Sequence, residues 1–504
     1  MGIFGGILCL LLAGFLSGEA QANWHVAKSD HFIIYSEEDP ESLRAYAQKL
    51  ERFDALLRRN QAAITRPFLP GDRLTIFALS SERALQRVVG QNSSQIAGIY
   101  RPSVTGSIAL TSRIKGHDPT ELNTQIVLLH EYAHHFMLLN FPASYPTWFV
   151  EGYAEFYSVS RFEDNGDVSI GIVALDRARE LMTTENMPSA DIFAGKIAYD
   201  AILDAKGWLL THYLSFEPSR KGQLEAFLEA LNAGKPPLDA ARAAFGDLRL
   251  LDRELHAYLH RKTMSYARIS AAFLTPGPVT VSDVSEGEAA MMEVRMNSRF
   301  GVDAREAQQR VAQARRIAAP YPNDPAVQCA LAEAEDDAAN PDNSDAAADR
   351  LLAVDPKSIC GMVFKGRAAL MRATKAKAAA DDKAWSVARS WFSRANHIEP
   401  EDPLPMSLYY TSYRVAQAQP TANAIAALYA AQARAPQDPG LRMLATTQLL
   451  RDGNPDEARL MLTPMLGGHS GNDALRDFYA RIGHDDPKSL ADELEKGPPK
   501  PAKK

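Results

Sequence analysis

The spacing of hydrophobic residues in the first half of the chain predicts a mixed α/β domain. Short apolar runs at His31–Tyr35, Leu74–Ala78, Ala97–Tyr100 and Ser107–Thr111 have the length of strands. Between the first two runs, apolar positions from Leu43 to Leu57 repeat at helical spacing after Asp39-Pro40, a helix cap followed by a first-turn proline. From about Thr120 onward, helical patterns dominate.

The second half of the chain, after about Asp303, consists of Ala-rich helical segments with a recurring start signal. Asp-Pro pairs occur at 324–325, 355–356, 402–403 and 438–439, and their prolines are 31, 47 and 36 residues apart. Helix pairs spaced near 34 residues resemble tetratricopeptide repeats, which implies an all-α solenoid of helical hairpins. A non-repetitive helical domain is the alternative, because the usual consensus positions are poorly matched.

The N-terminal segment has the pattern of an export signal. An apolar run from Ile3 to Leu16 precedes Ala20-Gln-Ala22, which forms an A-x-A cleavage site. We therefore expect residues 1–22 to be a signal peptide and the protein to be periplasmic or secreted. An uncleaved anchor or a buried apolar N-terminus is the alternative, since this region has no Lys or Arg.

These patterns divide the rest of the chain into four segments. We expect a first domain over 23–265, a linker with the first helix of the second domain over 266–300, helical repeats over 301–483, and a flexible tail over 484–504. In two of the Asp-Pro pairs, four residues separate the Asp from a cysteine, Cys329 in one case and Cys360 in the other. We expect both to be free buried thiols at equivalent repeat positions.

Composition narrows the possible partners. The 504 residues contain 55 Lys and Arg against 62 Asp and Glu, a net charge of −7. This balance gives no electrostatic footprint for nucleic acid. No apolar run reaches the ~18–20 residues needed to span a bilayer, so we expect no stable membrane span once the signal is removed.

One motif carries recognisable chemistry, His130-Glu131-Tyr-Ala-His134. Residues at i and i+4 of a helix share one face, so both imidazoles reach a single metal ion, while Glu131 is placed to take a proton from water. The surrounding helix, residues 125–139, is apolar nearly all round and is therefore expected to be central and buried. A structural histidine pair is the alternative for these residues.

A second apolar helix follows at Pro146 and carries two carboxylates, Glu151 and Glu155, one turn apart. Catalytic zinc sites use three protein ligands and leave a fourth position open, and His₂Glu is an established set. The two helices together therefore predict a Zn²⁺ site.

H-E-x-x-H followed by W-x-x-E-G-x-A-E, here Trp148 to Glu155, is similar to the gluzincin clan of zinc metallopeptidases, particularly bacterial peptidase-MA-like domains. The resemblance implies an α+β zincin-like fold with a central HExxH helix. It implies His130, His134 and Glu151 as zinc ligands, Glu131 as general base, and Glu155 as the residue that orients a ligand histidine. Sixteen residues separate His134 from Glu151, fewer than in the best-known members, so Glu155 stays an alternative third ligand.

The resemblance also implies hydrolysis of a protein or peptide substrate. The oxyanion formed needs a donor, for which Tyr199 is the first candidate and His212 the second, although a tyrosine is commonly a core residue. An extended substrate would bind beside a strand edge, at Ile96–Tyr100 or Ser107–Thr111. The repeats would recruit substrate or a protein partner. The alternative function is a non-catalytic binding scaffold with a structural metallopeptidase-like domain.

Overall fold

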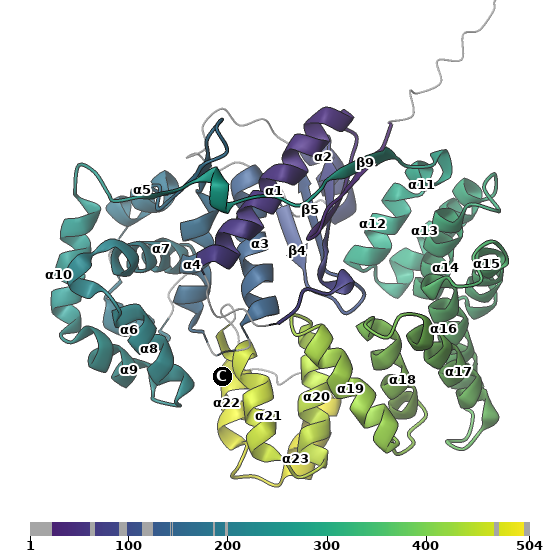
Figure 1. Ribbon diagram of the computed structural model, residues 1–504. Coiled ribbons are helices and arrows are strands. Elements are labelled where there is room, and N and C mark those ends of the chain that lie inside the picture. The colour runs from purple at the N-terminus through teal and green to yellow at the C-terminus, as the bar shows by residue number, and fades with distance from the viewer. Residues whose placement is uncertain are drawn as a thin grey trace, which may run out of the picture.

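A six-stranded sheet and a small three-stranded sheet are surrounded by helices in the computed structural model (Figure 1). It describes residues 23–60, 66–89, 98–112, 124–141, 143, 145–184, 187–196, 200–467 and 473–497. Residues 1–22, where we expect the signal peptide, lie outside the described residues. The architecture is mixed α/β in the first part and helical in the second.

The larger sheet has the strand order β4-β5-β3-β2-β1-β9. Its strands are β1 (His25–Lys28), β2 (Phe32–Ser36), β3 (Leu74–Leu79), β4 (Gly98–Arg101), β5 (Ile108–Ser112) and β9 (Thr280–Asp283). Strands β2, β3 and β5 are parallel, whereas β1, β9 and β4 are antiparallel to their neighbours. The four strands predicted from apolar runs are confirmed, and β4 is an edge strand.

Alternating side chains divide this sheet into two packed faces. Ile34 and Ile76 point to the face covered by α1 (Pro40–Asn60) and α3 (Thr124–Asn140), within the main core. Tyr35 and Phe77 point to the opposite face, which is covered by α2 (Glu82–Val89) and α12 (Met292–Phe300). In the predicted apolar stripe of α1, Leu43, Leu50, Phe53 and Leu57 are fully buried and Tyr46 is partly buried, which confirms that helix.

A helical layer next to α3 completes the first domain. It consists of α4 (Thr147–Ser158), α5 (Leu175–Thr183), α6 (Ser189–Phe193), α7 (Asp200–Phe216), α8 (Gln223–Asn232), α9 (Pro237–Phe245) and α10 (Leu248–Leu259). The smaller sheet, β6 (Arg161–Phe162), β7 (Val168–Ile170) and β8 (Ala267–Ile269), lies beside them. Short 3₁₀ helices occur at Pro70–Asp72 (η1), Pro218–Arg220 (η2), Ala271–Phe273 (η3) and Thr463–Gly467 (η4).

Residues 266–300, expected as a linker and a first helix, supply strands to both sheets. Strand β8 pairs with β7, and β9 pairs with β1 along the outer edge of the larger sheet. Two helices follow, α11 (Glu286–Ala290), capped by Ser285, and α12. Backbone hydrogen bonds therefore tie this segment to the first domain.

The second part of the chain is a succession of helices, and from α13 to α21 each helix packs on the next (Figure 1). They are α13 (Ala304–Ala318), α14 (Pro325–Asp337), α15 (Pro341–Val354), α16 (Ile359–Lys375), α17 (Lys383–Ile398), α18 (Pro403–Val415), α19 (Ala422–Arg434), α20 (Pro439–Arg451), α21 (Pro455–Leu462), α22 (Asp473–Arg481) and α23 (Pro487–Glu495).

Asp324, Asp402 and Asp438 cap helices that begin with proline, as predicted. The pair Asp355-Pro356 does not start a helix, because Asp355 ends α15 and Ser358 caps α16.

Two further expectations for the second part are wrong. Cys329 of α14 and Cys360 of α16 form a disulfide with Cα atoms 6.0 Å apart. Equivalent positions of successive hairpins face each other, which brings the two sulfurs together. The expected flexible tail over 484–504 contains α23, because Leu490 and Leu494 are buried in a cluster with Leu450 of α20. Residues 498–504 lie outside the described residues.

The helical part returns to the first domain near its C-terminal end (Figure 1). The turn between β4 and β5 contacts α20 through a hydrogen bond from the Val104 amide to Asp438 Oδ2, at 2.6 Å. Arg299 of α12 donates to the Thr105 carbonyl on the same turn, at 2.6 Å. Helix α12, before the helical succession, and the start of α20, late in it, therefore both contact this turn. Among the described helices, none has both the length and the hydrophobicity required to cross a membrane.

Candidate metal centre

Helix α3 presents a polar pair within an otherwise buried helix. Leu129, Ala133 and Phe136 are almost completely inaccessible, which confirms the expected central position of this helix. The side chains of His130 and His134, by contrast, are 17% and 13% exposed. Since these residues are one turn apart on the same face of the helix, both rings point toward α4.

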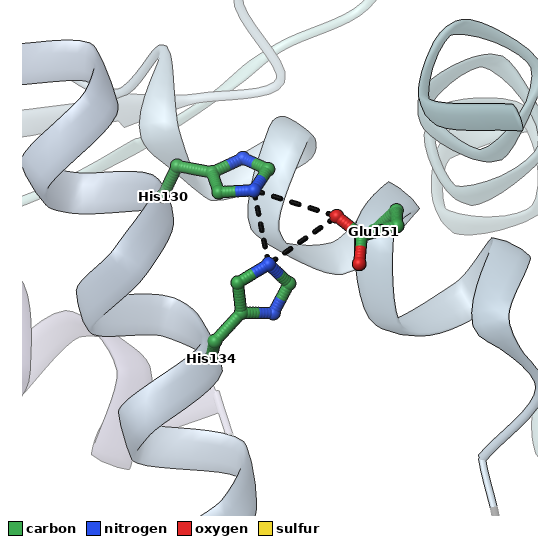
Figure 2. Close-up of side chains that lie close together, drawn as sticks. All are labelled: His130, His134 and Glu151. Carbon is green, nitrogen blue, oxygen red and sulfur yellow. Dashed lines mark hydrogen bonds and ion pairs between the residues drawn. The ribbon is translucent and has the colours of Figure 1, made fainter. Parts of the chain in front are cut away.

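Glu151 of α4 meets the two imidazoles at one point (Figure 2). The Nε2 atoms of His130 and His134 are 2.9 Å apart, and Oε2 of Glu151 lies 3.4 and 3.3 Å from them. Ligands about 2.0–2.1 Å from an ion at the centre of a tetrahedron are about 3.3 Å from one another. The three donor atoms therefore already have nearly the separations of one face of a zinc coordination tetrahedron.

Within the described chain, these three residues form the one group of His, Cys, Asp and Glu side chains whose donor atoms converge closely enough to hold a metal. Two imidazoles and a carboxylate are donors that suit zinc and several other divalent transition metals. The three residues therefore fit a divalent metal ion of this group.

Glu155 supports the site from one turn further along α4. Its Oε1 lies 3.3 Å from Nδ1 of His130, on the side of the ring opposite the shared point. A proton donated from Nδ1 to this carboxylate leaves the lone pair of Nε2 directed at the metal position. Glu151 is thus placed as the third ligand and Glu155 as the residue that orients His130.

Arg177 of α5 holds Glu155 in turn. Its Nη2 donates to Glu155 Oε1 at 2.6 Å and to Asp204 Oδ2 of α7 at 3.1 Å. Its Nη1 donates to Glu180 Oε2 at 3.4 Å. Neither Arg177 nor Asp204 belongs to the HExxH pattern. Both lie well beyond Glu155 in the chain, and no feature of the sequence links them to this site.

The electrostatics of the cluster favour positive charge at its centre. Burial lowers the pKa of His130, but hydrogen bonds to Glu151 and Glu155 outweigh it and raise the pKa to about 10. Burial raises the pKa of Glu151, but the charges and hydrogen bonds of His134 and His130 bring it far below its usual range. A bound divalent cation would supply the positive charge that two buried carboxylates require.

Close packing of α4 against α7 fixes the position of Glu151. A Cβ atom on Gly152 would lie 2.3 Å from the Gly207 carbonyl oxygen, and one on Gly207 would lie 2.3 Å from that of Trp148. The two glycines therefore allow the helix backbones to touch at the residue beside the ligand. This explains the glycine that follows the glutamate in the W-x-x-E-G pattern.

His135 and Glu131 lie on the side of α3 that faces the sheet. Buried His135 has one ring nitrogen 2.9 Å from the Tyr100 hydroxyl and the other 3.3 Å from the Asp72 carbonyl oxygen. Both ring nitrogens thus have partners within the fold, and the role of His135 is structural. Glu131 is partly exposed and lies one helical turn before His135, so its side chain extends from the side of α3 that faces β4.

The two candidates for the oxyanion donor differ in outcome. Tyr199 lies outside the described residues. His212 is fully buried, with Nε2 bonded to the Gly171 carbonyl at 2.9 Å and Nδ1 to the Tyr258 hydroxyl at 2.9 Å. Both ring nitrogens of His212 are therefore occupied within the core, and its candidacy is wrong.

Comparison with known proteins gives no further assignment. The chain matches no protein-family model and no curated protein sequence. The fold and site define a mixed α/β protein with a candidate metal-binding triad.

Proposed function

We propose that this protein is a zinc-dependent peptidase of the gluzincin type, with a zincin-like catalytic domain. The observation that carries the proposal is the convergence of His130, His134 and Glu151 at the separations of a tetrahedral face. The residue between the two histidines is a glutamate, the residue type that acts as general base in such sites.

Each side chain then has a separate task. His130, His134 and Glu151 hold the zinc ion, which when bound polarises the substrate carbonyl and acidifies water. Glu155, fixed by Arg177, orients His130. Glu131 accepts the proton of the attacking water and returns it to the leaving amine. Tyr199 remains the proposed donor to the developing oxyanion.

In the described structure, the unpaired edge of the larger sheet is evidence for a polypeptide substrate. Strand β5 is paired on both sides, with β3 and β4, so Ser107–Thr111 has no free edge for a substrate strand. Strand β4 pairs on one side with β5 and is the last strand of that sheet in the described structure. An extended peptide that pairs with β4 would lie next to α3, with its carbonyls near the metal site.

We further propose an exported protein whose tetratricopeptide-like hairpins bind substrate or a protein partner. The Cys329–Cys360 disulfide supports export, because disulfides persist in oxidising compartments and are rare in the cytoplasm.

The test combines metal analysis with one substitution. We expect the purified protein to contain about one zinc per chain and to cleave an unstructured protein such as casein. Glu131→Gln should retain zinc and lose activity by a factor of ~10²–10⁴, since it removes the general base and keeps the side-chain shape.

The matched control is Glu229→Gln, an exposed position on α8 that should leave activity unchanged. Undiminished cleavage by Glu131→Gln would contradict the assignment. A zinc-loaded wild-type protein that cleaves none of a panel of unstructured proteins would favour the binding scaffold.

A further inference from the structure

A cavity of about 480 Å³ lies between the two parts of the molecule. On one side it is lined by Pro70 and Gly71 before β3 and by the segment from Arg101 to Gly106, which ends β4 and turns into β5. On the other side it is lined by residues of α14, α16 and α18. Its volume is within the range of ligand-binding sites in proteins, roughly 300–1,000 Å³.

The lining of this cavity has an excess of negative charge. Three arginines face six carboxylates, which gives a formal balance of 3 − 6 = −3. The arginines are Arg101, Arg299 and Arg367, and the carboxylates are Glu333, Asp336, Asp337, Glu399, Glu401 and Asp402. Two of the arginines are already paired, Arg299 with Glu333 and Arg367 with Asp336.

Two adjacent carboxylates in this lining each have one buried oxygen without a hydrogen-bond partner among the described residues. Asp336 is only 5% exposed, and its Oδ2 pairs with Arg367, but its buried Oδ1 has no partner among the described residues. The buried Oδ2 of Asp337 lacks a partner in the same part of the chain. A buried carboxylate oxygen without a donor costs free energy, so a ligand that brings N–H groups would gain by filling this position.

The remaining walls suit the stem of a long cationic side chain. Val363, Phe364 and Leu404 supply apolar surface next to the acidic residues. Lysine and arginine have this amphipathic form, an aliphatic stem with a charged end. A metal ion is a poor match, because His130, His134 and Glu151 are the one converging ligand group that the described residues contain.

The cavity lies at the end of the edge strand proposed to bind substrate. Arg101 is both the last residue of β4 and part of the cavity lining. A strand rises about 3.3 Å per residue, so a peptide paired with β4 beside α3 reaches the cavity within a few residues. We propose that this cavity binds a lysine- or arginine-bearing segment of the polypeptide substrate, which rests on the proposed peptidase function and assigns it a basic substrate class.

The test measures binding separately from cleavage. Fluorescence anisotropy follows a labelled Ala-Ser-Lys repeat peptide and its Ala-Ser-Gln counterpart on the full-length, zinc-loaded Glu131→Gln protein, so that neither probe is consumed. We expect the lysine peptide to bind about 10-fold or more tightly than the glutamine peptide, as for hydrogen bonds to charged groups. Increasing salt should reduce this preference.

Matched variants locate the binding site. Asp337→Asn with Glu399→Gln removes two cavity carboxylates and should abolish the preference for lysine. Asp381→Asn with Glu457→Gln makes the same charge change at exposed positions outside the lining and should preserve it. If the double cavity variant unfolds, Glu399→Gln alone, at an exposed position, should still reduce the preference.

The outcomes separate the two proposals. Equal binding of both peptides, or a preference unaffected by the cavity variants, would overturn the basic-segment site. Cleavage of casein by wild-type protein without any preference for lysine would overturn only this inference. Selective lysine-peptide binding by a wild-type protein that cleaves nothing would overturn only the peptidase assignment.

Discussion

Replacement of Glu155 by glutamine tests the assignment of ligand and supporting residue most directly. The substitution removes one negative charge but keeps the side-chain size and a carbonyl acceptor for His130. Glu155 is 6% exposed, and its Oε1 contacts both His130 and Arg177. Arg177 keeps Asp204 and Glu180 as partners, so the guanidinium is not left unpaired.

The expected loss of zinc affinity follows from the hydrogen bond to His130. A hydrogen bond to a charged group contributes about 1.5–3 kcal/mol and a neutral one about 0.5–1.5 kcal/mol. Their difference of about 1–1.5 kcal/mol corresponds to roughly 10-fold in affinity, and residues that support a ligand histidine typically contribute 10–100-fold. We therefore expect zinc to bind about 10–100-fold more weakly to Glu155→Gln.

The same substitution affects folding, which needs a separate measurement. Burial raises the pKa of Glu155, but His130 and Arg177 outweigh it and lower the pKa to about 2. A depressed carboxylate pKa stabilises the folded protein above pH ~4.5, and this contribution is lost as pH falls toward 2. The shift corresponds to about 3 kcal/mol at most, so zinc binding is compared at a temperature where thermal unfolding shows each variant to be folded.

The assay is competition with a fluorescent zinc chelator, applied to wild type, Glu155→Gln, Glu151→Gln and Glu180→Gln. Glu180 contacts Arg177 but not His130 in the described structure, so Glu180→Gln should bind zinc like wild type. Glu151→Gln should lose more affinity than Glu155→Gln. Zinc affinity of Glu155→Gln within twofold of wild type would refute the orienting role. A greater loss for Glu155→Gln than for Glu151→Gln would make Glu155 the ligand.

Three other substitutions test the packing, the cavity and the disulfide. Gly152→Ala places a methyl group 2.3 Å from the Gly207 carbonyl oxygen of α7. The free energy of unfolding should fall by about 1–3 kcal/mol, and the zinc content should fall as well. Burial, reinforced by Glu333 and Asp336, raises the pKa of Asp337 to about 6, so its ionisation destabilises the protein as pH rises from ~4 to ~6. Asp337→Asn should be more stable than wild type at pH 8, by about 3 kcal/mol at most, and equal to it near pH 3 in thermal unfolding. Replacing both cysteines with alanine removes a crosslink between positions 31 residues apart. The free energy of unfolding, measured by denaturant titration, should fall by about 3–4 kcal/mol, and the zinc affinity should not change.

The candidate metal site could be predicted from the sequence because its residues lie close together along the chain. His130 and His134 are one helical turn apart, and Glu151 and Glu155 repeat that spacing on the next helix. Each pair is a polar interruption of an apolar helix, and such interruptions need a physical cause. The spacing alone left the choice between Glu151 and Glu155 open, since either carboxylate on that face reaches the histidines.

The residues that hold Glu155 in place could not be predicted from the sequence. Arg177 and Asp204 come from α5 and α7, and their contact with Glu155 depends on how those helices pack on α4. The disulfide was missed for a related reason. The repeat pattern placed Cys329 and Cys360 at equivalent positions, but only the stacking of α14 on α16 shows that equivalent positions are neighbours.

The boundary between the two parts also depends on long-range pairing. Strand β9 is short and polar, and nothing in its residues indicates that it completes a sheet begun at β1, more than 250 positions earlier (280 − 28 = 252). Met292 and Met296 of α12 then cover the face formed by Tyr35 and Phe77. The sheet that carries the edge strand therefore needs residues well beyond 265 for its own core.

This dependence links the helical part to the candidate active site. The β4–β5 turn is held by Arg299 at the start of the helical succession and by Asp438 near its end. Strand β4 leads directly into that turn, and its residue Tyr100 contacts His135 of the metal-binding helix. Movement of the hairpins on binding a partner would therefore act on the strand beside the metal site through two hydrogen bonds and one turn. The helical part is best understood as one wall of the proposed binding cavity, because it lines the cavity at the end of β4 and also holds the β4–β5 turn.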